Sequence, residues 1–269
     1  MQKNTTPHVI NAMKSLSRWQ TTFILFVAGA LMALGFAPYH LWPVIFIGLP
    51  VLYMLLARAT SYQQAAFRAF IFGYGYSMAG TWWIGNALLV DADKFAWLLP
   101  FSILGLSAVM ALWFGLFGAL VYALRAHMST VLFAVVWVLV EYARSVGIFG
   151  FPWNLLGYMS LASLPFAQGA ALVGTYGLSL VLVLLGLVPV LWLHSATRRQ
   201  KIIGTALPVF IVVAVVAYGL ARLSNPTEFT TITLRVVQPN VPQEVKGTRE
   251  GQAIAMQSLG QFTIATPKA

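Results

Sequence analysis

The 269-residue sequence contains no cysteine and few charged side chains. Without a thiol, the chain can form no disulfide, no zinc–thiolate site and no cysteine nucleophile of its own. Charged residues make up 8% of the chain, whereas a soluble domain carries roughly 25%. Hydrophobic residues make up 59%. Because so few charged side chains cannot cover a soluble globule of this size, the composition predicts a membrane protein.

Long apolar runs indicate the membrane spans, because a spanning helix needs about 20 apolar residues. Seven such runs precede residue 224. The fourth and the sixth exceed the thickness of the bilayer, and we expect these two to tilt, kink or extend beyond it. The predicted spans are Trp19–Ala37, Leu41–Ala57, Ala69–Leu89, Ala96–Leu124, Thr130–Val146, Phe166–Leu193 and Ile202–Leu220.

Basic residues are spread unevenly over the connections between these runs. Nine lysines and arginines lie on alternate connections, beginning with the N-terminal segment, and two lie on the others. The positive-inside rule then places the N-terminus in the cytoplasm and everything after Leu220 outside. A cleaved signal peptide is the alternative for the first run, but six further spans favour an uncleaved helix. The net charge of +10 forms no basic stripe, so nucleic acid is not an expected partner.

The composition changes near residue 224, which divides the chain into a transmembrane domain, 1–223, and a C-terminal segment, 224–269. A Ser-Asn-Pro turn signal marks the boundary. The β-branched run Thr230–Val237 predicts a strand, and Thr248–Thr263 has a weak helical pattern. One strand and one helix cannot bury a core. The segment is therefore either a disordered tail or the opening of a soluble domain, and the order of strand, turn and helix favours the second.

Glu141 is the only acidic residue inside a predicted span. An ionisable side chain at membrane depth is a functional candidate by default. Arg144 follows three residues later on the same helical face, so the two side chains can pair. They form either a structural ion pair that positions a loop near the outer interface, or part of a polar pocket that holds a lipid headgroup. Catalysis by Glu141 alone is not expected, because no nucleophile stands near it in the sequence.

The stretch Gly147–Pro165 is apolar, yet it is too rich in glycine and proline to form a regular helix. Irregular backbone at membrane depth occurs only where it is buried in protein or lines a cavity. Phe151 and Trp153 are its candidate lipid contacts. The stretch is either an interfacial loop with aromatic anchors or the mouth of a substrate cavity open to the outer leaflet, and the sequence favours neither interpretation.

The sequence predicts no site for a metal or a cofactor. Its four histidines are far apart and show no metal-ligand spacing. A Ser-His-Asp set cannot be assembled convincingly from them, and no Gly-rich phosphate-binding loop of the usual patterns occurs. We therefore expect neither a metal nor a cofactor.

Four short motifs follow one another along the chain. They are Gly35-Phe36-Ala37-Pro38-Tyr39 followed by Trp42-Pro43; Glu141-Tyr142-Ala143-Arg144 followed by Gly150-Phe151-Pro152-Trp153 and Gly157-Tyr158; Gly174-Thr175-Tyr176-Gly177-Leu178-Ser179; and Val236-Val237-Gln238-Pro239-Asn240-Val241-Pro242-Gln243 followed by Lys246. By these motifs, their order and spacing and the predicted topology, nearly the whole chain resembles bacterial apolipoprotein N-acyltransferase.

The resemblance implies a bacterial inner-membrane protein whose helices anchor a nitrilase-like α/β domain on the periplasmic face. The family moves an acyl chain from a phospholipid to the amine of the diacylglyceryl-cysteine that begins a lipoprotein. A cysteine thioester, a glutamate base and a lysine carry that reaction. Phospholipid and diacylglyceryl-lipoprotein are the implied partners, in lipoprotein maturation. Glu141, Arg144, Phe151, Trp153 and Gln238 are the candidate substrate-cavity or lipid contacts.

The catalytic Glu, Lys and Cys of the family cannot be carried over to this chain. In the family they follow the helix that begins here near Thr248, and a final anchoring helix follows them. Gly247 also stands where the family commonly has a tryptophan. We therefore expect a C-terminally truncated fragment with no catalytic residues of its own: an all-helical membrane bundle followed by the first strand and helix of an incomplete nitrilase-like domain.

Two other functions compete with the acyltransferase reading. One is a non-catalytic membrane protein that binds lipid or lipoprotein, which the missing nucleophile favours. The other is a small-molecule transporter. The odd number of helices, the lack of a repeat pair and the single intramembrane acid argue against the transporter.

Overall fold

A computed structural model describes residues 15–147, 150–193, 197–226, 230–232, 234, 236–242 and 245–264. Most of these residues are helical, and none of those described lies in a strand. The chain divides into two units, Met1–Trp83 with Ser102–Asn225, and Ile84–Phe101 with Pro226–Ala269. The first unit holds the helical bundle and all the residues of the candidate site except Gln238.

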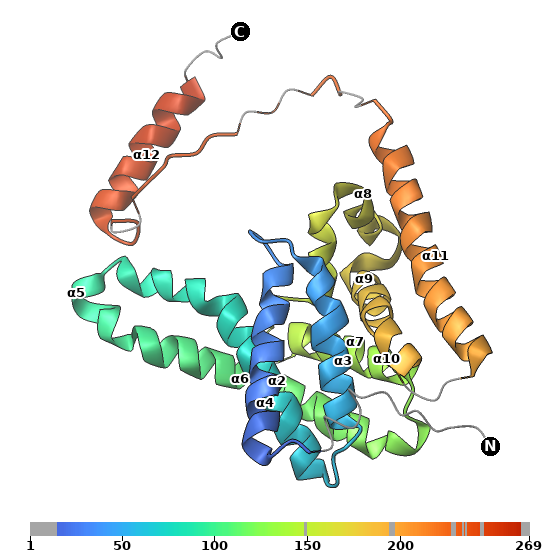
Figure 1. Cartoon of the computed structure of the whole chain (residues 1–269). Coiled ribbons are helices and arrows are strands. Elements are labelled where there is room, and N and C mark those ends of the chain that lie inside the picture. The colour runs from blue at the N-terminus through green and yellow to red at the C-terminus, as the bar shows by residue number, and fades with distance from the viewer. Residues whose placement is uncertain are drawn as a thin grey trace, which may run out of the picture. The chain divides into compact units, whose positions relative to one another are not determined.

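Short 3-10 segments, labelled η, connect many of the α-helices (Figure 1). In chain order the elements are α2 (Arg18–Met32), η1 (Ala33–Gly35), η2 (Trp42–Val44), α3 (Ile45–Leu56), α4 (Tyr62–Thr81), η3 (Trp82–Leu89), α5 (Ala92–Phe95), η4 (Ala96–Leu98), α6 (Leu99–Ala123), η5 (Arg125–His127), α7 (Thr130–Val146), η6 (Leu156–Ala162), α8 (Leu164–Ala167), α9 (Ala170–Gly186), α10 (Val188–Leu193), α11 (Arg198–Leu223) and α12 (Arg249–Ile264).

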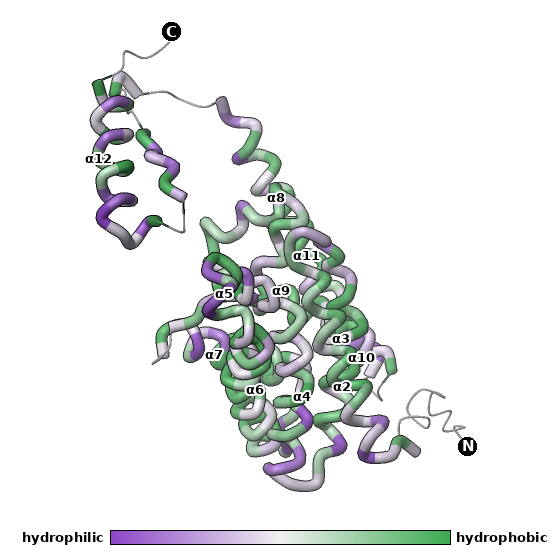
Figure 2. Tube along the Cα trace, turned by 90° about the vertical axis from the view of Figure 1, so that its left-hand side faces the viewer, coloured by the Kyte–Doolittle hydropathy of each residue, from purple (hydrophilic) through white to green (hydrophobic). Residues whose placement is uncertain are grey.

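Helices occupy all seven predicted spans, and hydrophobic residues follow most of their length (Figure 2). α4 carries Gln63, Gln64 and Arg68 in its first two turns, and α7 has 17 residues. The helical structure of the seven ranges is thereby confirmed, whereas the number of membrane crossings stays a prediction. Four stretches among the described residues are long and apolar enough to cross a membrane, namely Arg18–Gly35, Ala92–Ala123, Ala170–Leu193 and Arg198–Leu223; Trp42–Leu56 is apolar but shorter.

The sixth predicted span is a broken helix rather than one straight rod. The structure divides it into α8, α9 and α10. Within α9 the backbone of Gly174 departs from helical geometry, with φ 66° and ψ 177°. A side chain at this φ would be strained, which explains why glycine stands here. The expected kink is thus confirmed, and it coincides with the first residue of the third motif.

Glycines allow α2 and α4 to pack closely (Figure 1). A Cβ atom on Gly29 of α2 would overlap the backbone carbonyl of Phe72, and one on Gly75 of α4 would overlap that of Phe26. Small residues at such contacts let helix backbones approach each other, which is how membrane helices gain packing energy without a hydrophobic driving force. The contact between α2 and α4 therefore depends on these two glycines.

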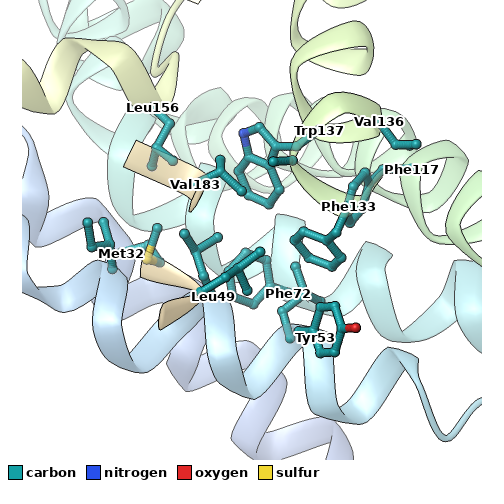
Figure 3. Close-up of a cluster of buried hydrophobic side chains, with 14 of the residues drawn as sticks. Met32, Leu49, Tyr53, Phe72, Phe117, Phe133, Val136, Trp137, Leu156 and Val183 are labelled. Atoms are coloured by element: carbon teal, nitrogen blue, oxygen red, sulfur yellow. The ribbon is translucent and has the colours of Figure 1, made fainter. Parts of the chain in front are cut away.

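Large aromatic side chains fill the interior between α3, α4, α6 and α7 (Figure 3). The rings of Phe117 and Trp137 lie edge to face with centroids 5.4 Å apart, and those of Phe117 and Phe133 lie 4.9 Å apart. The ring centroids of Tyr53 and Phe133 are 5.3 Å apart. Edge-to-face pairs add about 0.5–1.5 kcal/mol each beyond the burial of their area. The first turns of α7 are thereby fixed against the bundle.

The C-terminal segment confirms one of its two predicted elements. Helix α12 matches the predicted helix Thr248–Thr263 to within one residue at each end. Of the predicted strand Thr230–Val237, residues 233 and 235 lie outside the described residues, and none of the others forms a strand. A strand needs a partner for its backbone groups, and the part of the chain that the structure describes supplies no partner strand. The strand prediction is therefore not confirmed.

Candidate functional site

The segment between α7 and α8 folds back onto the end of α7 and onto α9. Three backbone amides hold it there. Phe151 N donates to the carbonyl oxygen of Arg144 at 3.2 Å. Leu156 N donates to Glu141 Oε1 at 2.8 Å, and Gly157 N donates to Ser179 Oγ at 2.8 Å. The second and third motifs, which are separate in the sequence, therefore meet in this one structure.

Glu141 is the buried acceptor that holds the segment to α7. Its side chain is 6% exposed, and Oε1 also accepts a hydrogen bond from Trp137 Nε1 at 3.0 Å. Trp137 precedes it by one helical turn, and both Trp137 and Leu156 face the core (Figure 3). Hydrogen bonds to a carboxylate contribute more than neutral ones, about 1.5–3 kcal/mol each. These contacts hold the segment to α7, and a role for Glu141 in a polar lipid site stays a prediction.

The predicted ion pair between Glu141 and Arg144 is not formed. The only ion pair among the described residues joins Lys94 and Asp91. Arg144 is 4% exposed and lines a cavity of about 10 Å³ together with Glu141. Such a cavity has the room of about one water molecule. Glu141 Oε1 accepts from Leu156 N and Trp137 Nε1, while Oε2 is buried without a hydrogen-bond partner. The carboxylate and the guanidinium thus line one buried cavity without forming a salt bridge.

Phe151 and Trp153 lie together in an aromatic cluster with Trp83. The rings of Phe151 and Trp153 are 5.0 Å apart, and Trp153 stacks on Trp83 at 4.9 Å with an interplanar angle of 15°. Trp83 and Trp153 are exposed. Exposed aromatic rings of this kind suit a membrane interface as well as the mouth of a cavity, so both interpretations of this segment remain open. Two residues of the segment, Ile148 and Phe149, lie outside the described residues.

The first motif joins the same region through Gly35 and Phe36. A Cβ atom on Gly35 would overlap the side chain of Met159. The ring of Phe36 contacts Tyr76 edge to face at 5.8 Å, and the Tyr76 hydroxyl donates to the carbonyl oxygen of Asn154 at 2.7 Å. Three of the four motifs that carry the resemblance are therefore in contact around one loop.

The third motif approaches the loop at backbone distance. A Cβ atom on Gly157 would overlap the carbonyl oxygen of Thr175, so only glycine permits this approach. The bend at Gly174 lies immediately before that contact. Gly157 of the second motif is thus required by the contact between η6 and α9, and Gly174 of the third motif by the bend before it.

An apolar cavity of about 200 Å³ opens beside these motifs. Trp42 of the first motif lines it, and so do Met159 and Ser160 of η6. Ala162 of η6 and Ser163, the N-cap of α8, continue this wall. The remaining wall comes from α8, α9 and α11, through Phe166, Leu182, Leu185, Val212 and Val216. A small, mostly apolar space of this kind suits a hydrocarbon chain better than a polar metabolite.

A family profile described as apolipoprotein N-acyltransferase N-terminal domain matches residues 28–188. This chain belongs to the apolipoprotein N-acyltransferase family. It is similar to proteins named apolipoprotein N-acyltransferase from three bacteria. The identity is 35% for Rhodopseudomonas palustris, over 89% of this chain and 46% of that protein. It is 33% for Allorhizobium ampelinum, over 94% and 50%, and 37% for Bradyrhizobium diazoefficiens, over 85% and 44%. The chain spans about half the length of the curated relatives that it matches.

The matched N-acyltransferase domain contains four of the five predicted site residues, Glu141, Arg144, Phe151 and Trp153. Gln238 lies beyond it, in the second unit, where its side chain is exposed. The structure brings Glu141 and Arg144 to one buried cavity, and Phe151 and Trp153 to one aromatic cluster. A role for Gln238 stays a prediction. Among the described residues no group of His, Asp and Glu could hold a metal ion.

Sequence reasoning missed several members of this candidate site. Trp137 could have been found, because it precedes Glu141 by four residues and shares its helical face. The amide of Leu156, the hydroxyl of Ser179 and the ring of Tyr76 gave no local signal. Their contacts with the loop join positions 15 to 78 residues apart, which no helical periodicity can reveal.

Proposed function

We propose that this chain provides the membrane part of an apolipoprotein N-acyltransferase and holds a phospholipid acyl chain beside the loop 150–163. The observation that carries the proposal is the apolar cavity of about 200 Å³, which is lined by Trp42 of the first motif and by Met159 and Ser160, directly after the second motif. Burial of hydrocarbon contributes about 0.8 kcal/mol per CH₂ group. A cavity of this size takes part of an acyl chain, while the rest of the lipid remains in the bilayer.

The proposed reaction transfers an acyl chain from a phospholipid to the α-amine of a diacylglyceryl-cysteine at the start of a lipoprotein. The sulfur of a cysteine thiol first attacks the lipid ester carbonyl and forms a thioester, while the lysophospholipid leaves as an alcohol that takes up the thiol proton. The amine then attacks the thioester carbonyl, loses a proton and releases the thiol. Residues 1–269 contain no cysteine, so within this proposal they present the lipid and do not supply the nucleophile.

The proposal assigns the C-terminal segment to the beginning of the nitrilase-like domain. Helix α12 and the fourth motif around Gln238 support this assignment. In this arrangement the chain lies in the bacterial inner membrane with its N-terminus in the cytoplasm and residues after 223 in the periplasm. The nine-to-two distribution of basic residues supports that orientation.

A second function is supported by the absence of cysteine. On that reading the chain binds lipid or lipoprotein without catalysis. The same cavity and aromatic cluster would then hold a lipid for recognition alone. The two functions differ in whether the bundle can support acyl transfer when a catalytic domain is supplied.

A chimera separates the two functions. Residues 1–223 of this chain would be joined to the aligned C-terminal half of the Rhodopseudomonas palustris relative and expressed in cells depleted of their own N-acyltransferase. Because the bundle presents the lipid substrate, we expect the chimera to restore the third acyl chain on lipoproteins, as measured by mass spectrometry of their N-terminal peptides. The full-length relative is the positive control, and its C-terminal half alone is the negative control. A chimera that inserts at the control level and leaves lipoproteins diacylated would contradict acyl transfer.

A further inference from the structure

A second cavity, of about 730 Å³, lies between the first turns of α2 and α4. Arg18 and Thr22 line it from α2, and Gln63, Phe67 and Arg68 line it from α4. Its volume falls in the range of small-molecule sites, about 300–1,000 Å³. None of the four motifs that carry the family resemblance contributes a lining residue to it, so its role does not depend on the function proposed above.

The N-terminal part of the sequence is rich in positive charge. The first 90 residues contain Lys3, Lys14, Arg18, Arg58 and Arg68, and the first acidic residue of the sequence is Asp91. Arg18 and Arg68 both line the cavity. In the part of the chain that the structure describes, no carboxylate lies within 4.0 Å of these two arginines. Two positive charges beside one cavity favour an anionic ligand.

The two helix ends add to this positive potential. Ser17 caps α2 by accepting from Gln20 N at 3.2 Å, and Ser61 caps α4 by accepting from Gln64 N at 3.2 Å. Neither helix has an acidic residue in its first turn. A helix N-terminus carries about half a positive charge. Both helix dipoles therefore act in the same direction as the arginines.

Arg68 is held in position for a ligand. Its Nη1 atom donates to the carbonyl oxygen of Leu55 at 2.6 Å. An arginine has five N–H donors in a fixed plane, so one such bond fixes the guanidinium and leaves other donors for an anion. Arginine binds phosphate groups with two parallel hydrogen bonds. The chemistry of the cavity thus suits a phosphate.

Apolar side chains next to the arginines indicate that this phosphate belongs to a lipid. Phe67 lines the cavity itself. Trp19 and Phe23, which neighbour Arg18 and Thr22 on α2, are both exposed. Hydrophilic residues gather where these helices begin, at the lower end of the bundle in Figure 2, and hydrophobic residues follow above them. A ligand with a phosphate head and hydrocarbon tails matches this order of hydrophilic and hydrophobic residues. A free phosphate would contact the arginines but not the apolar side chains.

We propose that the cavity between α2 and α4 binds the phosphate of an anionic phospholipid through Arg18 and Arg68, at the membrane face where both helices begin. This site is separate from the loop around Glu141. Helix α4 runs from Ser61 at the cavity to Tyr76 at the loop, and 15 residues of helix span roughly 22 Å. The bound lipid stabilises the contact between α2 and α4 and is not consumed by the acyl transfer.

The test uses the purified 269-residue chain in neutral detergent, with phosphatidylglycerol, phosphatidylcholine or inorganic phosphate added in turn. Native mass spectrometry would count the retained lipids, and thermal unfolding would report their stabilising effect. We expect phosphatidylglycerol to bind more tightly than phosphatidylcholine, because only the former has a net negative charge. Arg18→Gln should weaken the binding of phosphatidylglycerol roughly fivefold, which is the effect of one basic residue near a lipid surface.

Arg222→Gln is the matched control, because Arg222 is also exposed on a long helix but lies in the last turn of α11. It should leave phosphatidylglycerol binding unchanged. Arg68→Gln also removes the bond to Leu55, so Arg18→Gln is the decisive variant. Equal binding of the two lipids, or equal effects of Arg18→Gln and Arg222→Gln, would overturn the proposal. Inorganic phosphate that stabilises as strongly as phosphatidylglycerol would overturn its lipid part.

Discussion

Replacing Glu141 with alanine is expected to destabilise the protein by about 2–5 kcal/mol and to release the loop 150–163 from α7. The substitution leaves the Leu156 amide and Trp137 Nε1 without their acceptor. A buried donor that loses its partner costs about 1–3 kcal/mol. Arg144 also loses the carboxylate that lines the same small cavity, which adds to the cost. Thermal unfolding in detergent would measure the first effect, and amide hydrogen exchange at Leu156 the second.

The two controls for this prediction are Leu139→Ala and Glu141→Gln. Leu139 is exposed on the same helix, and its removal should change stability by no more than about 0.5 kcal/mol. Glutamine keeps a carbonyl acceptor, so Glu141→Gln should lose less stability than Glu141→Ala. The Leu156 amide should stay protected from hydrogen exchange. Two results together would contradict the positioning role of Glu141. The Glu141→Ala and Leu139→Ala variants would unfold at the same temperature, and the Leu156 amide of Glu141→Ala would exchange no faster than in the parent chain.

Replacing Gly29 with valine is expected to cost about 3 kcal/mol, at the upper end of the usual range for overpacking. A Cβ atom at this position meets the backbone carbonyl of Phe72, and a backbone group cannot move aside as a side chain can. Helices α2 and α4 must therefore separate, and the cavity between their first turns must change with them. Thermal unfolding of the purified variant measures the loss.

Gly105→Val in α6 is the matched control for Gly29→Val. A Cβ atom on Gly105 meets nothing within 4 Å, so the same substitution there should cost little beyond the helix propensity of valine. Equal unfolding temperatures for the two variants would show that α2 and α4 do not depend on close backbone contact.

The sequence was sufficient for the helices because membrane spans are long and their apolar side chains are contiguous. Helices occupy all seven predicted ranges, and α12 lies where the weak pattern Thr248–Thr263 placed it. The strand Thr230–Val237 was argued from β-branched residues alone. Local propensity cannot make a strand without a partner, and none of the described residues provides that partner.

The sequence predicted several residues of the candidate site but not the contacts between them. Glu141 stood out because a charge at membrane depth is rare, and Phe151 and Trp153 stood out in a Gly- and Pro-rich stretch. Helical spacing suggested Arg144 as the partner of Glu141, but the carboxylate accepts from Leu156 instead. That contact depends on how the loop folds back. Spacing along one helix carries no information about it.

The contacts around Leu156 and Gly157 show that residues from several family motifs hold the same loop. Glycines at 35, 157 and 174 permit close approach or a bend, and Glu141 and Ser179 bind the loop amides. Together they shape one wall of the apolar cavity that Met159 and Ser160 line. We therefore predict that this cavity, rather than the exposed surface of the bundle, holds the acyl chain of the phospholipid that donates it.

Photo-crosslinking with a phospholipid that carries a diazirine in its acyl chain tests this claim most directly. We expect the labelled peptides to contain Phe166 and Leu182, and we expect Val216→Trp to lower their labelling by about tenfold. A tryptophan there displaces at least two buried CH₂ groups, at about 0.8 kcal/mol each. Val213→Trp, on the same helix but 61% exposed, should leave the labelling unchanged. Labels spread over the exposed helix faces, and equal in both variants, would contradict the account.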